Sequence, residues 1–266
     1  MNNRYAITFG EVAILHIGGK EYGNGRLDHG FSTKELKKIA EEHNDTEYIS
    51  ISDKLPRQLK TDNEAGILIF RSVSNNQNNK DKKFVLGLNK KEADKLYLEQ
   101  ETVQYDQKYW DNRRKKTLNK RARYNIVFGK ERIEHSDNYK QNSVASFSDL
   151  KYLNKFRKRL HLILGQKAKK LNAEGNKYFH EKAGIGYHGD AERKIVICLS
   201  LGKPTTLRYN WRLPGSSEHT LEPTDIKLNH GDVYVMSEKA TGYDWKSRSK
   251  VRVVHAAGHS SYINKV

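Results

Sequence analysis

The 266-residue sequence has few of the features that mark secreted or membrane proteins. It contains one cysteine, Cys198, so it forms no internal disulfide, and this fits a reducing compartment. No apolar run reaches the about 18 residues that a transmembrane helix needs, and the first residues lack the apolar stretch of a signal peptide. We therefore expect an intracellular protein of the cytoplasm or nucleus that is not secreted.

Acidic residues are scarce relative to basic ones. The chain has 49 Lys and Arg against 32 Asp and Glu, which gives a formal net charge of +17. The basic residues are clustered, as at 113–116 next to Trp110, and such a surface neutralises phosphates while its aromatic rings stack on bases. We expect nucleic acid, DNA or RNA, as the partner, and no membrane. The alternative is a solvated surface in a chain rich in Lys and Asn.

One set of residues has the composition of a metal site. His188 and Asp190 stand two positions apart, and His255 follows much later in the chain. Two histidines and one carboxylate can hold one face of Fe(II) and leave the other face open for a co-substrate and O₂. Since residues i and i+2 of a strand point to the same side, we expect the first two on one strand and His255 on a neighbouring strand. The alternative is a surface loop with ordinary polar residues.

Short strands with turn residues between them surround these positions. Their apolar or alternating patterns predict strands at 184–187, 195–202, 206–211, 226–228, 233–236 and 251–255. A series of short strands of this kind favours an antiparallel barrel or sandwich, such as a jelly roll. We therefore expect an α+β, mainly β, protein.

Five segments occur in a recognisable order in the last third of the chain. They are Asn176-x-Tyr178, His188-x-Asp190-x-Glu192, Ser200-Leu201-Gly202, Leu228-x-x-Gly231-Asp232-x-x-x-Met236, and His255. In this order they resemble the AlkB-like branch of the Fe(II)/2-oxoglutarate dioxygenases. The resemblance covers the chain from Asn176 onward, and a looser match extends back to the segment 121–125.

The resemblance implies a double-stranded β-helix (jelly-roll) core with supporting helices. We expect this core at about 172–266 within a dioxygenase domain of residues 76–266, preceded by a small N-terminal α+β extension of residues 1–75. The extension is expected to contain strands at 5–17, 48–51 and 67–70, and a helix at 32–43 that Ser32 caps with Glu35 in a capping box. A polar stretch at 72–83 is expected to be a linker or exposed loop, and a basic amphipathic helix is expected at 147–171, capped by Ser146 or Ser148.

The resemblance also implies the cofactors and their ligands. Fe(II) would bind His188, Asp190 and His255, with 2-oxoglutarate and O₂ as co-substrates, and Asn176 and Tyr178 stand where the family hydrogen-bonds 2-oxoglutarate.

The basic residue that grips the distal carboxylate of 2-oxoglutarate is less evident. The family usually places two arginines after the distal histidine, and here no arginine follows His255. We expect Lys265 to hold the carboxylate as a point charge, with Arg252 and Arg208 as fallbacks. The alternative is that Lys265 belongs to a solvated terminus.

Substrate-binding residues are inferred from the same resemblance. Glu192 stands where a carboxylate recognises the target base, although a surface role beside Arg193 is equally open. Arg121, Arg123 and Tyr124 precede the core as the family's nucleotide-recognition segment does. Tyr187 and Trp245 are further candidates for stacking, and we favour a core role for Tyr187.

The predicted activity is the hydroxylation or oxidative demethylation of a base in DNA or RNA. A base in a duplex would have to be flipped out to reach the iron. Three alternatives stay open: a protein or peptide hydroxylase with the same iron site, a catalytically inactive nucleic-acid-binding module, and a cupin-type binding protein, which would be expected to have more clustered histidines.

Overall fold

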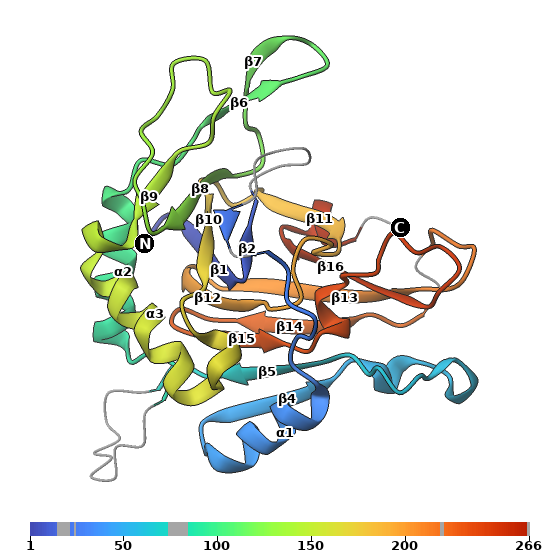
Figure 1. Cartoon of the computed structure of the whole chain (residues 1–266). Coiled ribbons are helices and arrows are strands. Elements are labelled where there is room, and N and C mark those ends of the chain that lie inside the picture. Colours follow the sequence, from blue (N-terminus) through green and yellow to red (C-terminus); the bar gives the residue numbers. More distant parts are fainter. Residues whose placement is uncertain (15–21, 24, 74–84, 219–220, 265–266) are drawn as a thin grey trace.

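Two β-sheets form the centre of the protein in the computed structural model, which describes residues 1–14, 22–23, 25–73, 85–218 and 221–264 (Figure 1). The larger sheet has eight strands in the order β4 (Thr46–Ser50), β5 (Gly66–Phe70), β15 (Val233–Met236), β12 (Ile197–Gly202), β1 (Arg4–Gly10), β10 (Asn172–Tyr178), β8 (Tyr124–Gly129) and β9 (Val144–Ser146). The smaller sheet has four, in the order β11 (Gly184–His188), β16 (Arg252–Gly258), β13 (Thr205–Arg212) and β14 (Thr224–Leu228). All neighbouring pairs are antiparallel except β8 and β9, and the fold is the expected jelly roll.

Apolar side chains fill the space between the two sheets. They come from β5, β12 and β15 on one side and from β13, β14 and β16 on the other, and include Ile67, Ile69, Cys198, Met236, Leu207, Tyr209, Trp211, Ile226, Leu228 and Val253. Trp211 also donates its indole N–H to the carbonyl of Ile51 at 3.1 Å, which satisfies the polar atom of a buried ring.

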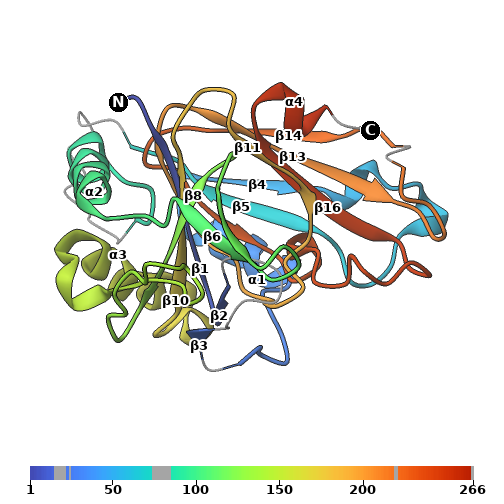
Figure 2. The same cartoon turned by 90° about the horizontal axis from the view of Figure 1, so that it is seen from above.

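A second core lies on the outer face of the larger sheet. There α2 (Lys90–Thr102) and α3 (Lys151–Leu164) pack against the sheet, on the side away from β13 and β16 (Figure 2). The alternation of β1 serves both cores, because its side chains point alternately to the two faces. Tyr5, Ile7 and Phe9 are buried in the helix-covered core, whereas Arg4, Ala6 and Thr8 face the other way.

The boundary expected at residue 75 does not separate two units. β1 lies between β12 and β10, and β5 pairs with β15, so strands from the first 75 residues are integral to the larger sheet. α1 (Thr33–Glu42) packs on β4 and β5 at the edge of that sheet. The physical reason is that sheet hydrogen bonds join strands far apart in sequence, which local patterns do not reveal.

The helices show where a local sequence signal was sufficient to predict the start or end of a helix. α1 begins as expected: the Ser32 hydroxyl accepts from the Glu35 N–H at 3.1 Å, and Glu35 accepts from the Ser32 N–H at 2.7 Å. The helix expected at 147–171 is shorter: Ser146 caps only a 3-10 turn at 147–149, α3 covers Lys151–Leu164, and Gly165, with a φ of 74°, ends it. The N–H groups that start α3 are instead bound by Glu99 of α2, a tertiary contact.

Several smaller elements complete the described chain. They are the pair β2 (Val12–Ala13) and β3 (Tyr22–Gly23), the hairpin β6 (Lys108–Asp111) and β7 (Lys116–Asn119), and α4 (Ser260–Ile263). The sequence analysis had not predicted α2 or the hairpin, and most of the expected loop at 72–83 lies outside the described residues. Within the described part of the chain, no helix has the length and apolarity that a membrane crossing requires.

The central place of β1 makes its apolar side chains sensitive to truncation. Ile7 is 0% exposed, and we expect Ile7→Ala to lower the free energy of unfolding by about 2–5 kcal/mol, because it leaves a cavity in a packed core. Leu98→Ala, at a position on α2 that is 64% exposed, is the control and is expected to change stability by less than about 1 kcal/mol. Urea unfolding of both variants measures this, and an equal loss of unfolding free energy in the two would contradict the central position of β1 in the core.

Candidate metal centre

Three possible metal ligands converge at one end of the smaller sheet. His188 ends β11 and lies opposite His255 of β16 in the antiparallel register, with their ring centroids 4.5 Å apart. Asp190 follows in the next loop, and one ligand atom from each of the three residues lies within 4.8 Å of the others. No other group of three His, Cys, Asp or Glu side chains in the described ranges meets in this way. The sequence spacing thus corresponds to a three-dimensional cluster.

Asp190 reaches the cluster from a loop, not from a strand. β11 ends at His188, so the expectation that His188 and Asp190 share one strand face is wrong. Instead, the Asp190 N–H donates to the carbonyl of Thr241 at 2.8 Å, which brings the loop back over the site. Gly189 allows this turn, because a Cβ at this position would lie 2.2 Å from the carbonyl oxygen of Gly242.

Burial keeps both histidines in the form that binds a metal. Burial, with the neighbouring His188 acting in the same direction, lowers the pKa of His255 to about 3. Burial also lowers the pKa of His188, whose Nδ1 lies 2.8 Å from the carbonyl of Gly186 and leaves Nε2 toward Asp190. Nδ1 of His255 is buried with no hydrogen-bond partner among the described residues. Two neutral imidazoles beside a carboxylate fit Fe(II).

A buried arginine balances the acidic side of the site. Burial opposes ionisation of Asp190, but the Arg193 guanidinium holds the pKa of that carboxyl below its usual range. Arg193 also pairs with Glu174 at 3.0 Å and with Glu192 at 2.8 Å. It passes over Gly10 of β1, where a Cβ would lie 2.8 Å from its Cδ. Arg193 therefore connects the ligand loop to two strands of the larger sheet.

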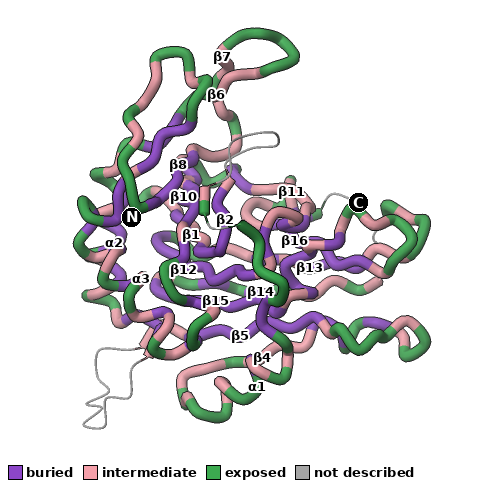
Figure 3. The backbone as a smooth tube through the Cα atoms, in the orientation of Figure 1, coloured by how far each residue is buried: buried purple, intermediate pink, exposed green. Residues whose placement is uncertain are grey.

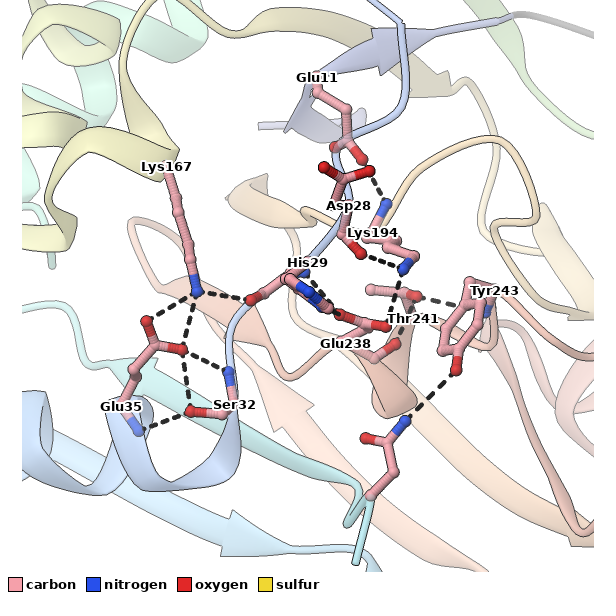
Figure 4. A network of polar contacts seen from close by, with 12 residues as sticks. Glu11, Asp28, His29, Ser32, Glu35, Lys167, Lys194, Glu238, Thr241 and Tyr243 are labelled. Atoms are coloured by element: carbon pink, nitrogen blue, oxygen red, sulfur yellow. Dashed lines mark hydrogen bonds and ion pairs between the residues drawn. The ribbon is translucent and has the colours of Figure 1, made fainter.

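A polar network fixes the far end of the ligand loop (Figure 4). Glu11 accepts from the backbone N–H of Lys194 at 2.6 Å and from that of the following residue at 3.0 Å. The Lys194 ammonium lies 3.1 Å from Glu238, and the Thr241 hydroxyl donates to the Glu238 carbonyl at 2.8 Å. The Thr241 carbonyl also accepts from the backbone N–H of Asp190. The loop that carries the carboxylate is therefore held by Thr241 at Asp190 and by Glu11 at Lys194.

A cavity of about 90 Å³ adjoins the three ligands between the two sheets. Its apolar lining includes Ile185, Leu207, Leu228, Met236 and Ala257. Its polar lining comes mainly from β1, β10 and β12 and includes Arg4, Thr8, Glu174, Asn176, Tyr178, Arg193, Ser200, Lys203 and Thr205. Mostly apolar walls with a few polar groups are typical of a small-molecule site.

The residues expected to bind the co-substrate lie in different places. Asn176 and Tyr178 line the cavity, where the Asn176 carbonyl oxygen accepts from the Arg123 Nε at 2.6 Å and from Asn125. Arg208 lies outside the cavity lining and pairs with Asp225 at 2.5 Å. Arg252 also lies outside it, where its guanidinium donates to the backbone carbonyls of residues 213, 216 and 245. Lys265 is outside the described residues.

The candidate substrate residues surround the same region. Glu192 is tied to Arg193 beside Asp190, and Trp245 lies against the ligand loop, since a Cβ on Gly189 would be 2.7 Å from its Cδ1. Tyr187 is half-buried, and its hydroxyl donates to the Ile263 carbonyl at 2.7 Å and accepts from Asn210. Tyr124 is half-buried and stacks on Phe179 with centroids 4.1 Å apart.

Two of the basic candidates are separated by their exposure. Arg121 is exposed, whereas Arg123 turns inward to Asn176.

Sequence reasoning missed three polar residues of the site: Arg4, Glu174 and Arg193. A signal for Arg4 was present in the alternation of residues 4–9. Large apolar side chains occupy positions 5, 7 and 9, so Arg4 lies on the opposite face of the strand with the small residues Ala6 and Thr8. No local pattern indicates the pairing of Glu174 with Arg193, since it depends on how the loop after Asp190 meets β10.

The fold and the ligand cluster agree with the comparison of the sequence with known families. Residues 73–248 match the profile of the 2OG-Fe(II) oxygenase superfamily, and the chain belongs to this family. The family implies Fe(II) and 2-oxoglutarate, and the donor set of the cluster and the adjoining cavity fit both.

A full-length relative extends the comparison to both ends of the chain. An uncharacterized protein of Acanthamoeba polyphaga mimivirus is 34% identical over 265 residues, which cover 97% of this chain and 96% of the relative. The similarity therefore extends to His255, which lies outside the family match.

Removing the ligand carboxylate is expected to abolish tight iron binding. Asp190→Ala leaves two imidazoles and no anionic ligand, so the purified protein reconstituted with Fe(II) without air should retain far less than one iron per chain. Asp225→Ala, which removes a surface carboxylate paired with Arg208, is the control. Metal analysis after gel filtration measures both, and equal iron in wild type and Asp190→Ala would refute the site.

Gly189 is expected to be required for the site but not for the fold. In Gly189→Ala the added methyl group meets the carbonyl of Gly242, so the loop must shift and Asp190 must move away from the histidines. We expect at least roughly tenfold weaker Mn²⁺ binding, as for lost ligand-orienting contacts. Gly186→Ala, where a Cβ meets no atom within 4 Å, is the matched control. Titration calorimetry distinguishes the two, and unchanged binding in Gly189→Ala would contradict this geometry.

Proposed function

We propose that the protein is an Fe(II)- and 2-oxoglutarate-dependent dioxygenase of the AlkB-like branch that oxidises a base in DNA or RNA. The observation that carries this proposal is a basic hairpin followed in sequence by Arg123, which binds Asn176 in the wall of the metal cavity. Family membership accounts for the iron chemistry, and the hairpin supports the choice of a polyanionic substrate.

The hairpin β6–β7 stands clear of the two sheets above β8 (Figure 1). Its tip, residues 112–116, is exposed throughout and contains four consecutive cations, Arg113, Arg114, Lys115 and Lys116 (Figure 3). One carboxylate, Asp111, lies beside them and is 3.9 Å from Arg114. Trp110 is half-buried on the hairpin, with the Lys140 ammonium 4.7 Å from its ring centroid. Cations beside an aromatic ring suit phosphates and an adjacent base.

The chain continues from this hairpin to a residue that contacts the cavity wall. Lys120, just after β7, is half-buried, and its partial burial lowers its pKa to about 8. Three residues later Arg123 binds Asn176, which lines the cavity next to the metal ligands. Tyr124 then stacks on Phe179 at the end of β10. A strand held by the hairpin tip would thus have a route for one base toward the iron.

The protein residues have separable roles in this reaction. His188, Asp190 and His255 would hold one face of Fe(II), and Arg193 keeps the carboxylate ionised. The apolar walls of the cavity exclude water from the reacting centre. When bound, Fe(II) with 2-oxoglutarate and O₂ supplies hydroxylation of a C–H bond, with succinate and CO₂ as co-products.

The product depends on which carbon of the base is positioned. An N-methyl group that is hydroxylated loses formaldehyde and is demethylated, whereas a C5-methyl group becomes a stable hydroxymethyl group. A base within a duplex must first leave the stack, at a cost of a few kcal/mol, before the cavity can receive it.

Turnover with defined oligonucleotides tests the proposal. Wild-type protein with Fe(II), 2-oxoglutarate and air should form succinate and change the mass of an N-methylated or C5-methylated base, and Asp190→Ala should do neither. Succinate that forms only with peptides would transfer the proposal to peptide hydroxylation. Oligonucleotide binding without any iron binding would instead indicate an inactive nucleic-acid-binding module.

The hairpin tip is expected to carry much of the salt-dependent binding. Replacing Arg113, Lys115 and Lys116 together by Gln should weaken oligonucleotide binding and reduce the slope of log K against log salt by about 3, close to one for each lost phosphate contact. The matched control replaces Lys34, Lys37 and Lys38, which are exposed on α1 at the opposite end of the protein. Fluorescence anisotropy at several salt concentrations measures both, and equal slopes would exclude the hairpin as the interface.

A further inference from the structure

The first strand of the chain contributes an arginine to the metal cavity. Arg4 begins β1 and lies opposite Tyr178 of β10 on one side and Gly202 of β12 on the other. Its guanidinium donates to the Thr205 hydroxyl at 2.9 Å and to the Ala183 carbonyl at 2.6 Å. Since both acceptors belong to or adjoin the smaller sheet, Arg4 bridges the two sheets at one end of the cavity.

The charge of Arg4 has no acidic partner in the described part of the chain. Its two acceptors are neutral, and its third contact is the ring of Tyr178, with the guanidinium carbon 5.2 Å from the ring centroid. Burial lowers the pKa of Arg4 from its usual value, which reflects the cost of holding an uncompensated cation there. Such a group is available for an anion that enters the cavity.

The other two cations that line the cavity are less suited to this role. Arg193 is already surrounded by the carboxylates of Glu174, Glu192 and Asp190. Lys203 is exposed, so its ammonium can stay hydrated. Arg4 is half-buried and therefore combines partial burial, a planar pair of donors and a charge with no acidic partner among the described residues.

Arg4 and the three metal ligands line the same cavity, and the register of β1 and β10 relates their positions. Arg193 joins Asp190 to Glu174, and Glu174 lies opposite Thr8 in the register of β1 and β10. Thr8 and Arg4 are four residues apart, about 13 Å along a strand. Bound between these two levels, a five-carbon diacid could chelate the metal with its 2-oxo acid end and direct its other carboxylate toward Arg4.

We propose that Arg4, on the N-terminal strand, binds the distal carboxylate of 2-oxoglutarate, with the Thr205 hydroxyl beside it. This rests on the proposed function only in that the protein binds 2-oxoglutarate. It differs from the expectation for Lys265, Arg252 or Arg208, because it places the anion-binding residue at the opposite end of the sequence from His255. The co-substrate site is then assembled from both ends of the chain.

Equilibrium binding to the Mn²⁺-loaded protein tests the assignment without turnover. Titration calorimetry compares 2-oxoglutarate with oxalate, which chelates the metal but has no distal arm. Arg4→Ala should weaken the binding of 2-oxoglutarate at least roughly 30-fold and leave the binding of oxalate and of Mn²⁺ unchanged. Arg4→Lys should recover part of the loss, because it restores a point charge without the guanidinium fork. Arg208→Ala, at an arginine outside the cavity lining, is the control variant and should bind both ligands as wild type does.

The remaining outcomes each overturn a distinct claim. Equal losses for 2-oxoglutarate and oxalate would make Arg4 a structural residue, and an unchanged 2-oxoglutarate affinity would exclude it. A selective loss in Lys265→Ala with none in Arg4→Ala would assign the carboxylate to Lys265. Wild-type protein that binds Mn²⁺ and oxalate but not 2-oxoglutarate would overturn the proposed function itself. If 2-oxoglutarate binds through Arg4 but no base is modified, only the substrate part of the proposed function fails.

Discussion

The hydrogen bonding of β1 to both β10 and β12 is the constraint on which the rest of the structure depends. These two pairings join the first ten residues to strands more than 160 positions later, and they close the larger sheet at its centre. One face of β1 then supports α2 and α3, while the other face forms the floor of the metal cavity. Fold and site therefore share a single strand, and its alternation of apolar and polar side chains serves both.

Charge compensation explains why the site holds together before any ligand binds. Asp190, Glu174 and Glu192 gather around the buried Arg193, so each carboxylate faces a cation and none of these charges is isolated, although the carboxylates outnumber the one cation. The histidines contribute no charge, because burial keeps them neutral. Asp190 is already ionised and the two histidines are neutral. The carboxylate of Asp190 is therefore the ligand whose charge attracts a divalent cation.

The hairpin tip at 112–116 and the cavity residue Arg4 differ in exposure, and this difference separates their roles. The hairpin tip at 112–116 is fully exposed and repels itself, so a polyanion would relieve that repulsion at the surface. Arg4 is half-buried and lines one small cavity, so it suits a single carboxylate. Arg123 lies between them, bound to Asn176, and connects the outer surface to the inner wall.

Local patterns in the sequence were sufficient wherever a short segment specifies its own structure. The apolar runs of β12 and β15, the alternation of β13 and the capping box of Ser32 with Glu35 all predicted elements that the structure contains. The spacing of His188, Asp190 and His255 pointed to the residues that converge. α2 went unrecognised because it buries only four residues, one of them Gln100, and so has little apolar periodicity.

Only the tertiary structure decided the features that join distant segments. Tertiary contacts, not strand geometry, bring Asp190 to the histidines, since Thr241 and Arg193 hold its loop. The central position of β1, and with it the placement of Arg4, depends on sheet pairings that carry no local signature. The sequence by itself determined which side chains could bind the metal, because their chemistry is intrinsic. Their geometry and the shape of the cavity required the fold, because both arise from residues that meet only when the two sheets pack.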